Sequence, residues 1–177
     1  MSRVGKHTVV IPASVTMSQE RDVFFFKGKL GESCISVPDC VNVCVNEHGL
    51  DVRPNDETSF ARAMWGTVQR NLTNAIKGVS DGFCVTLDLV GVGYKALVNG
   101  QTLILQLGFS HDVEYLIPEG VLIKCEKPTQ ISITSNSKQL TGSIAARLRS
   151  YRPPEPYKGK GVIRAGEFVV RKEGKKK

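Results

Sequence analysis

The residues with the clearest capacity for chemistry are the cationic side chains near the end of the chain. Between Arg147 and Lys177 stand eleven lysines and arginines against three glutamates, so these 31 residues carry +8 while the first 146 carry −1. Each Lys or Arg set against a phosphate releases a condensed counterion, so a charge segregated in this way favours a polyanionic partner. The sequence therefore predicts a nucleic-acid-binding surface at this end, including Arg147, Arg149, Arg152, Lys158, Lys160, Arg164, Arg171 and Lys172.

The stretch YRPPEPYKGKG, residues 151–161, adds more specific features to this charge. Its prolines favour a stiff, extended backbone over residues 152–156. Gly159 lets the backbone approach another surface closely, and Tyr157 can stack on a base or a sugar. The alternative is a solvated basic tail without a specific role. That alternative stays open mainly for residues 175–177, because Pro, Tyr and paired Gly in fixed order are unusual in disordered tails.

Three other motifs give weaker signals. Residues 91–96 fit the dinucleotide-binding pattern G-x-G-x-x-A, but they run into a strand rather than a helix, which favours a glycine corner. Residues 135–138 have the S-x-x-K spacing of some serine hydrolases, yet they stand where a helix should begin and where Ser and Asn act as caps. The turn at residues 108–111 could touch nucleic acid through Phe109, Ser110 and His111, or could be a plain hairpin turn.

Cysteine usage and hydropathy bound the class of protein. The five cysteines are odd in number and include no C-x-x-C pair, which argues against a disulfide framework and a zinc ribbon and favours reduced thiols in the cytosol. No apolar run approaches the roughly 18 to 20 residues needed to cross a bilayer, and the N-terminus lacks the apolar region of a signal peptide. We expect no cofactor, no metal and no membrane partner.

The elements that position the basic residues are short alternating strands and two helices. An Asn99-Gly100 turn between two apolar runs predicts a hairpin. The first helix is predicted to begin near Asn55 and Asp56, which are good N-caps, and to end at Gly78. Its buried stripe recurs about every four residues, at Phe60, Met64, Val68, Leu72 and Ile76. A second helix has the same spacing, at Leu140, Ile144, Leu148 and Tyr151.

The two halves of the chain match at an offset of 80 residues. Pro38 corresponds to Pro118, and Val43 to Ile123; after one inserted residue, Leu50 corresponds to Ile131. This order predicts an internal duplication. The fold class expected is α+β, with two tandem duplicated domains that are each an antiparallel sheet packed by one helix. The boundaries expected are an N-terminal domain at 1–81, a C-terminal domain at 82–152 and a basic tail at 153–177.

The run PEPYKGKGV, residues 154–162, resembles the signature of the bacterial form of large-subunit ribosomal protein number six. The opening MSRVGK and the runs KGKLG (27–31), LVGVGYKA (89–96) and LGFSH (107–111) resemble that family in the same order, so the resemblance covers essentially the whole chain. The chain departs from the usual pattern at Pro153, where many members have Arg, and at Ile163-Arg164, where Arg-Tyr is common.

The resemblance implies a structural protein of the cytoplasmic ribosome, without catalysis. It implies binding to the large-subunit rRNA mainly through the C-terminal domain and tail. It places the protein near the stalk base, beside neighbouring ribosomal proteins and the docking site of translational GTPases. The expected contacts add five residues to the basic set: Tyr157, Gly159, Lys95, Ser110 and His111.

The sequence gives less support to two other function classes. An enzyme on a phosphorylated substrate would need converging acid, base or metal groups, and the sequence offers no such cluster. A basic protein for DNA or anionic membranes is a further alternative, although no helix has the basic amphipathic pattern of a membrane binder. For RNA binding, we expect that removing residues 151–177 abolishes the interaction while both domains stay folded.

Overall fold

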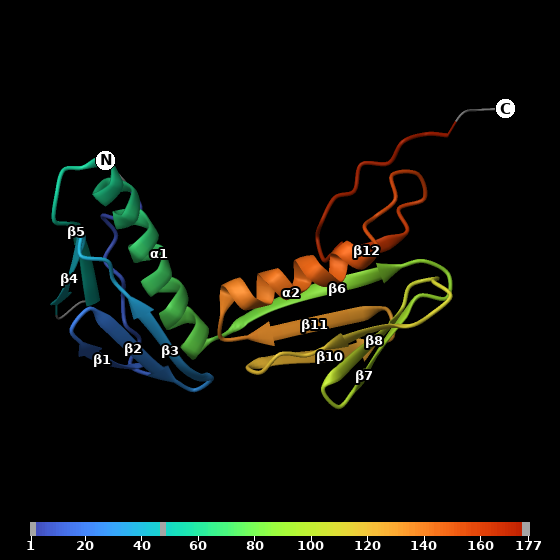
Figure 1. Cartoon of the computed structure of the whole chain (residues 1–177), viewed down its shortest axis with the longest axis horizontal. Coiled ribbons are helices and arrows are strands. Elements are labelled where there is room, and N and C mark those ends of the chain that lie inside the picture. The colour runs from blue at the N-terminus through green and yellow to red at the C-terminus, as the bar shows by residue number, and fades with distance from the viewer. Residues whose placement is uncertain (1–2, 47–48, 175–177) are drawn as a thin grey trace. The chain divides into compact units, whose positions relative to one another are not determined.

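A computed structural model of the chain describes residues 3–46 and 49–174. The chain divides into two compact units, residues 1–82 and residues 83–177, whose helices and strands are drawn in Figure 1. Each unit has its own hydrophobic core. Both units combine antiparallel strands with one long helix, which confirms the predicted α+β class.

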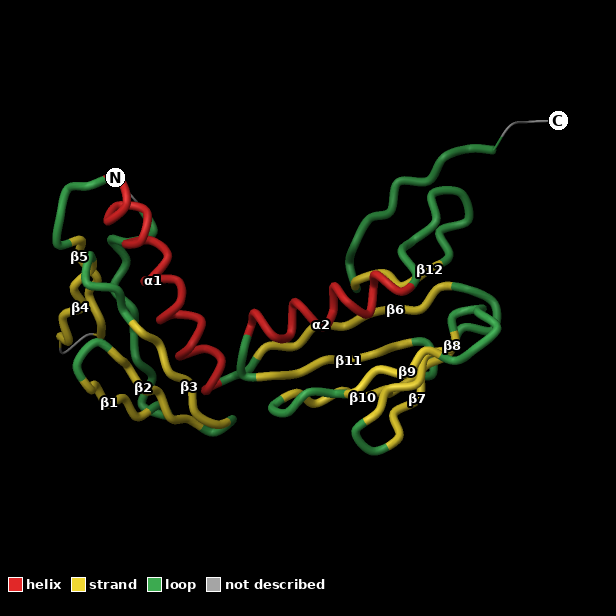
Figure 2. The backbone as a smooth tube through the Cα atoms, viewed as in Figure 1, coloured by secondary structure: helices red, strands yellow, loops and turns green. Residues whose placement is uncertain are grey.

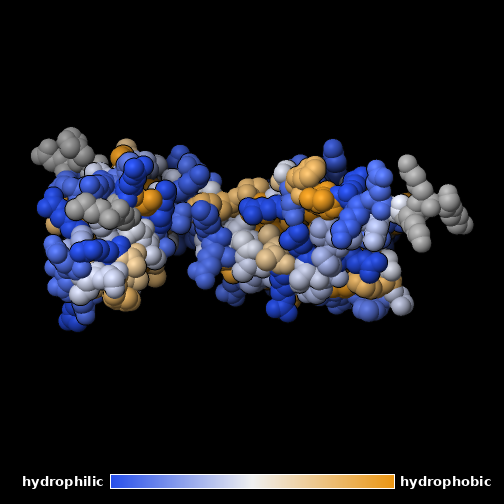
Figure 3. All heavy atoms as spheres, turned by 90° about the horizontal axis from the view of Figure 1, so that it is seen from above, coloured by the Kyte–Doolittle hydropathy of each residue, from blue (hydrophilic) through white to orange (hydrophobic). Residues whose placement is uncertain are grey.

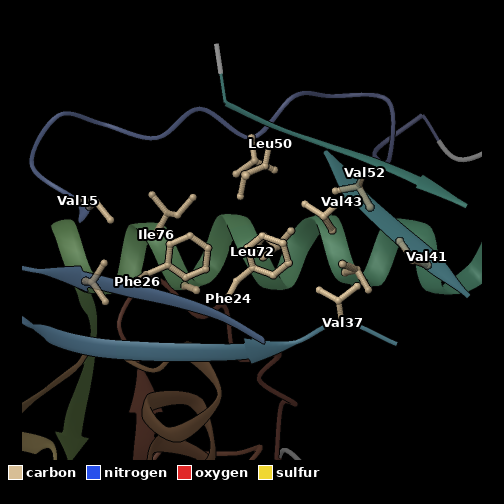
Figure 4. Close-up of a cluster of buried hydrophobic side chains, with 14 residues drawn as sticks. Val15, Phe24, Phe26, Val37, Val41, Val43, Leu50, Val52, Leu72 and Ile76 are labelled. Atoms are coloured by element: carbon tan, nitrogen blue, oxygen red, sulfur yellow. The ribbon is translucent and has the colours of Figure 1, made fainter. Parts of the chain in front are cut away.

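The first unit consists of two small antiparallel sheets and one helix. The three-stranded sheet has the order β1-β2-β3, and β4 pairs with β5. The elements are β1 (Thr16–Glu20), β2 (Val23–Gly28), β3 (Gly31–Ser36), β4 (Val41–Asn46), β5 (Gly49–Pro54) and α1 (Ser59–Ser80). Both sheets contribute to the core against α1: Phe24 and Phe26 from β2, and Leu50 from β5, surround Leu72 of the helix (Figure 4).

The limits of α1 differ from the predicted ones. The helix begins at Ser59, with Thr58 as the N-cap whose hydroxyl accepts a hydrogen bond from the Ala61 N–H at 3.2 Å. Asn55 does not cap it, because its side-chain amide donates to the Asp39 carbonyl at 2.6 Å and holds the chain beside β4. Phe60, expected in the buried stripe, is 64% exposed and lies in the first turn of the helix, next to exposed residues 55–59. Gly78 is a buried residue inside the helix, which continues to Ser80.

The second unit has the same plan with additional strands. Its elements are β6 (Phe83–Val90), β7 (Lys95–Asn99), β8 (Thr102–Gln106), β9 (Val113–Leu116), β10 (Val121–Lys127), β11 (Gln130–Ser135), α2 (Lys138–Tyr151) and β12 (Gly161–Arg164). One sheet has the order β7-β8-β9, and the other has the order β10-β11-β6-β12. The predicted β7–β8 hairpin is confirmed, but Asn99 pairs with Thr102 as the last residue of β7, so the turn is made by Gly100 and Gln101.

The duplication is visible in the strand register. Val43 pairs with Val52 in the first unit, and Ile123 pairs with Ile133 in the second. The one residue by which the second half is longer at this point coincides with a register shift in β10 between Lys124 and Lys127. Each unit therefore repeats a three-stranded sheet, a strand pair and a helix, although the strands form two sheets per unit where the sequence indicated one.

Local capping at α2 explains the S-x-x-K spacing. Ser137 is the N-cap of α2, and its hydroxyl accepts from the Leu140 N–H at 3.3 Å. The Ser135 hydroxyl donates to the Gly120 carbonyl at 2.9 Å, which ties the end of β11 to the turn before β10. Ile144 and Leu148 are buried in the core of this unit, which confirms the predicted stripe of the helix.

Candidate nucleic-acid-binding surface

The basic segment after α2 folds back on itself. Residues 152–162, here called the basic loop, leave the end of α2, turn at residues 156–158 and return to β12 (Figure 2). The Val162 N–H donates to the Arg152 carbonyl at 2.8 Å and closes the loop. Within it, the Glu155 N–H donates to the Lys160 carbonyl at 2.8 Å. The proline-rich arm is thus one side of a closed loop.

Two glycines of the basic loop meet steric demands that other residues would not. Gly161 has φ +144°, and a Cβ at this position would lie 2.7 Å from the Pro153 carbonyl oxygen. Gly159 has φ +69°, and a Cβ there would lie 3.0 Å from the guanidinium of Arg171. Because both values of φ are rare for L side chains, the paired glycines are required by the shape of the loop.

The strand β12 anchors the loop to the second unit. Residues 161–164 pair antiparallel with β6, so that Val162 lies opposite Leu89. The Val162 side chain is fully buried in the same core as Leu148 of α2. At the other end of the loop, Lys158 is exposed and Tyr157 is 55% exposed. The loop thereby exposes Tyr157 and Lys158 while its end at β12 is fixed in the sheet.

The segment after β12 returns to the basic loop and adds further charge. The Lys172 N–H donates to the Pro156 carbonyl at 2.7 Å, and the Arg171 guanidinium lies against Gly159. The structure therefore brings Arg171 and Lys172, both exposed, beside Lys158, although they are 13 and 14 positions apart in sequence.

Arg149 and Arg164 form a separate group beside α2. An Arg149 Nη2 lies 2.6 Å from the Glu167 Oε1, and the other oxygen of Glu167 accepts from the Arg164 N–H at 3.3 Å. These residues line a hollow of about 230 Å³ together with Gly142 and Ala146 of α2. The Arg149 charge is thus compensated within the chain, which a count of basic residues does not reveal.

A third group gathers the end of α2 and the loop after β8. The Phe109 and His111 rings are stacked with centroids 6.0 Å apart, and the Arg152 guanidinium carbon lies 5.2 Å from the Phe109 centroid. Burial raises the pKa of Tyr115 on neighbouring β9, against an opposing influence of the Arg147 charge. His111, Arg147 and Arg152 thus lie around one part of the surface.

The remaining predicted positions are more scattered. Ser110 is exposed in the same loop as His111, and Lys160 is half-buried within the basic loop. Lys95 is exposed on β7, opposite Gln106 of β8. Sequence reasoning placed Phe109 in a turn that could touch nucleic acid but left it out of the expected contacts, and it did not single out Glu167. An aromatic residue in a polar turn was a usable signal for Phe109, whereas nothing local marks Glu167 as a partner of Arg149.

The general surface and the other motifs offer no competing site in the described residues. Hydrophilic residues cover most of the face shown in Figure 3, with smaller hydrophobic groups among them. No three or more His, Cys, Asp or Glu side chains gather as a metal site within residues 3–46 and 49–174. In that same part of the chain, no helix has the length and apolar character needed to span a membrane. Residues 91–93 form a loop between β6 and β7, so the glycine motif is not at a helix N-terminus.

Comparison with known proteins gives a single family. The family model described as Ribosomal protein L6 matches residues 11–82 and 90–164. The chain is 52% identical to "Large ribosomal subunit protein uL6" of Paramagnetospirillum magneticum and 52% identical to that of Parvibaculum lavamentivorans. It is 48% identical to the protein of Rhodospirillum centenum, and in all three cases the match covers 177 residues and the full length of both chains. The two matched segments fall in the two units, and the chain belongs to the ribosomal protein L6 family.

Proposed function

We propose that the chain is a structural constituent of the large ribosomal subunit in the cytoplasm, and that it binds large-subunit rRNA through its second unit. The relatives are each named as large-subunit proteins. The observation that carries the rRNA part is the partition of charge between the units. Residues 1–82 contain nine basic and nine acidic side chains, whereas residues 83–177 contain fifteen and eight, a net +7. Membership of this family agrees with the expectation that the chain is not an enzyme.

The proposed contact is made by fixed backbone and cations rather than by a flexible tail. The basic loop places Tyr157, Lys158 and Gly159 together at its tip, and hydrogen bonding at Lys172 holds the returning segment beside them. The double-stranded parts of RNA are recognised mainly by shape and by contacts to phosphate and 2′-hydroxyl groups. Phosphate contacts fix the orientation of a protein on RNA, so a rigid loop suits this task.

The place of the protein in the subunit is a second part of the proposal. The family resemblance supports a site near the stalk base, beside neighbouring ribosomal proteins and close to where translational GTPases dock transiently. Crosslinking of Lys158 to neighbouring proteins in intact subunits, with a lysine-reactive reagent, tests this placement. Crosslinks only to proteins far from the stalk base would contradict it.

Salt dependence tests the phosphate contacts directly. If about five basic groups meet phosphates, log K against log salt for the chain and deproteinised large-subunit rRNA slopes at about −3.5 to −4.5. Replacing Lys158 and Lys160 by Gln should make the slope shallower by about 1.4 to 1.8. The matched control replaces Lys6 and Lys29, both exposed in the first unit, and should leave the slope unchanged. A slope near zero in the wild-type chain would refute phosphate binding.

Charge substitution is a cleaner test than deletion. Removing residues 151–177 would also remove β12 and the fully buried Val162 side chain from the core of the second unit. The structure therefore argues against the expectation that both domains stay folded after this deletion. Competition between large-subunit rRNA and duplex DNA of equal length completes the assay, since equal affinity would favour a general polyanion binder.

A further inference from the structure

A hollow of about 360 Å³ opens on the second unit beside the basic loop. It is lined by Phe109, His111, Asp112, Val113, Glu114 and Tyr151, from the loop after β8, from β9 and from the end of α2. Aromatic rings and two carboxylates therefore surround one cavity on the unit with the excess of positive charge. The proposed phosphate contacts do not account for this combination, because carboxylates repel phosphates.

The aromatic side chains suit a planar ligand. Phe109 is 40% exposed although it is a large apolar side chain, and its ring stacks with His111 at a centroid distance of 6.0 Å. Tyr151 lines the same hollow from α2. Proteins bind unpaired bases by stacking them on aromatic side chains, and every base presents a π-face for this contact.

The carboxylates suit the edge of a base. Asp112 accepts a hydrogen bond from the Gln106 amide at 2.9 Å, which holds this part of the loop in place. Glu114 is exposed on β9 at the same hollow. Ionised carboxylates only accept hydrogen bonds, so they pair with the amino groups of guanine, cytosine or adenine and not with phosphate.

We propose that this hollow holds one unpaired, amino-bearing base of the rRNA, with Glu114 accepting from its edge. The Arg152 guanidinium, 5.2 Å from the Phe109 centroid, stands where it can meet the phosphate of the same nucleotide. The inference rests on the proposed rRNA binding and adds a contact to a base, which can carry sequence information that phosphate contacts lack. The hollow thereby becomes the part of the surface that distinguishes one rRNA position from another.

Chemical footprinting of deproteinised large-subunit rRNA tests this proposal. Dimethyl sulfate and kethoxal modify the pairing edges of unpaired adenine, cytosine and guanine. We expect the wild-type chain to protect at least one such base, and we expect Phe109→Leu and Glu114→Gln each to lose that protection. The affinity of Phe109→Leu should fall roughly fivefold to a hundredfold, the range of one base–aromatic stack. Its salt slope should become shallower by no more than about 0.7 to 0.9, the share of the single phosphate contact of Arg152, because no cation is removed.

Matched variants separate the base contact from other causes. Phe60→Leu makes the same change at an exposed residue of the first unit, and Glu119→Gln removes an exposed carboxylate outside the hollow. Both should keep the wild-type protections. Protections identical in Phe109→Leu, Glu114→Gln and the wild-type chain would overturn the base site while leaving a salt-dependent phosphate contact intact. Absence of salt-dependent binding by the wild-type chain would overturn both proposals.

Discussion

Replacing Gly161 by Ala should open the basic loop without unfolding the second unit. The backbone at this position has φ +144°, a value that L side chains rarely adopt. The new Cβ would lie 2.7 Å from the Pro153 carbonyl oxygen and 2.8 Å from the Pro154 Cα. Both neighbours are main-chain atoms, so relief requires the proline arm to move away from β12.

The size of the effect follows from two contributions. Holding a residue with a side chain in such a backbone conformation costs about 1 to 3 kcal/mol. Moving the arm also removes the hydrogen bond from the Val162 N–H to the Arg152 carbonyl, worth about 1 kcal/mol. We therefore expect a local loss of about 2 to 4 kcal/mol, which is less than the usual total stability of a domain, about 5 to 15 kcal/mol.

Hydrogen exchange at the Val162 and Glu155 amides measures this opening. A loss of 2 to 4 kcal/mol predicts roughly 30-fold to 1,000-fold faster exchange at both amides, with amides in β10 and β11 little changed. Gly166→Ala is the control, because Gly166 also has positive φ, +79°, but a Cβ there meets nothing within 4 Å. If the two variants exchanged alike, close packing against Pro153 would not be what holds the loop, and the reasoning would fail.

Three further outcomes follow from single contacts. Glu167→Gln removes the partly exposed ion pair with Arg149, so the free energy of unfolding should change by only about 0 to 1 kcal/mol. Because Arg149 is then free to meet a phosphate, the salt slope for rRNA binding should steepen by about 0.7 to 0.9. An unchanged slope in binding titrations would place Arg149 away from phosphate. Trp65→Phe removes the hydrogen bond from the indole N–H to the Val52 carbonyl in the first unit, so urea unfolding should show a free energy of unfolding lower by about 1 to 2 kcal/mol. The affinity for rRNA should stay unchanged, and a loss of affinity would point to an rRNA contact in that unit. Burial raises the pKa of the Cys125 thiol, so less of it is ionised between pH 7 and 9, roughly the range around a free thiol's pKa. Iodoacetamide should therefore modify Cys125 more slowly than exposed Cys84, with mass spectrometry measuring both rates. Equal rates would contradict the burial of Cys125.

The features that could be predicted from the sequence are those specified by neighbouring residues. The turn signal at Asn99 and Gly100 predicted the β7–β8 hairpin to within one residue, and the apolar spacing around Ile144 predicted the buried side of α2. The start of α1 was predicted wrongly because a contact distant in sequence decides it. Asn55 could have capped a helix, but its amide is bound to the carbonyl of Asp39, 16 positions earlier.

The shape of the candidate surface depends on contacts that have no local signature. The four residues of β12 pair with β6, more than 70 positions earlier in the chain, and nothing in the run GVIR specifies that partner. The pairing of Arg149 with Glu167 likewise crosses 18 positions. Counting charges identifies the basic region of the sequence, whereas only the folded structure shows which cations, such as Arg149, are paired with an acid of the same chain.

A difference between the duplicated units explains where the basic loop is attached. In the first unit, Val9 exchanges two backbone hydrogen bonds of 2.9 Å with Leu50, and this bridge lies outside the named strands. In the second unit, Ile131, the counterpart of Leu50, pairs with Leu87 of the eight-residue strand β6. The strand β11 pairs with one edge of β6, and β12 covers the other edge, whose N–H and C=O groups would otherwise be unpaired. The pairing of β12 with β6 removes a site at which another strand could add to the sheet. It also fixes one end of the basic loop on the second unit, which is the unit with the excess of positive charge.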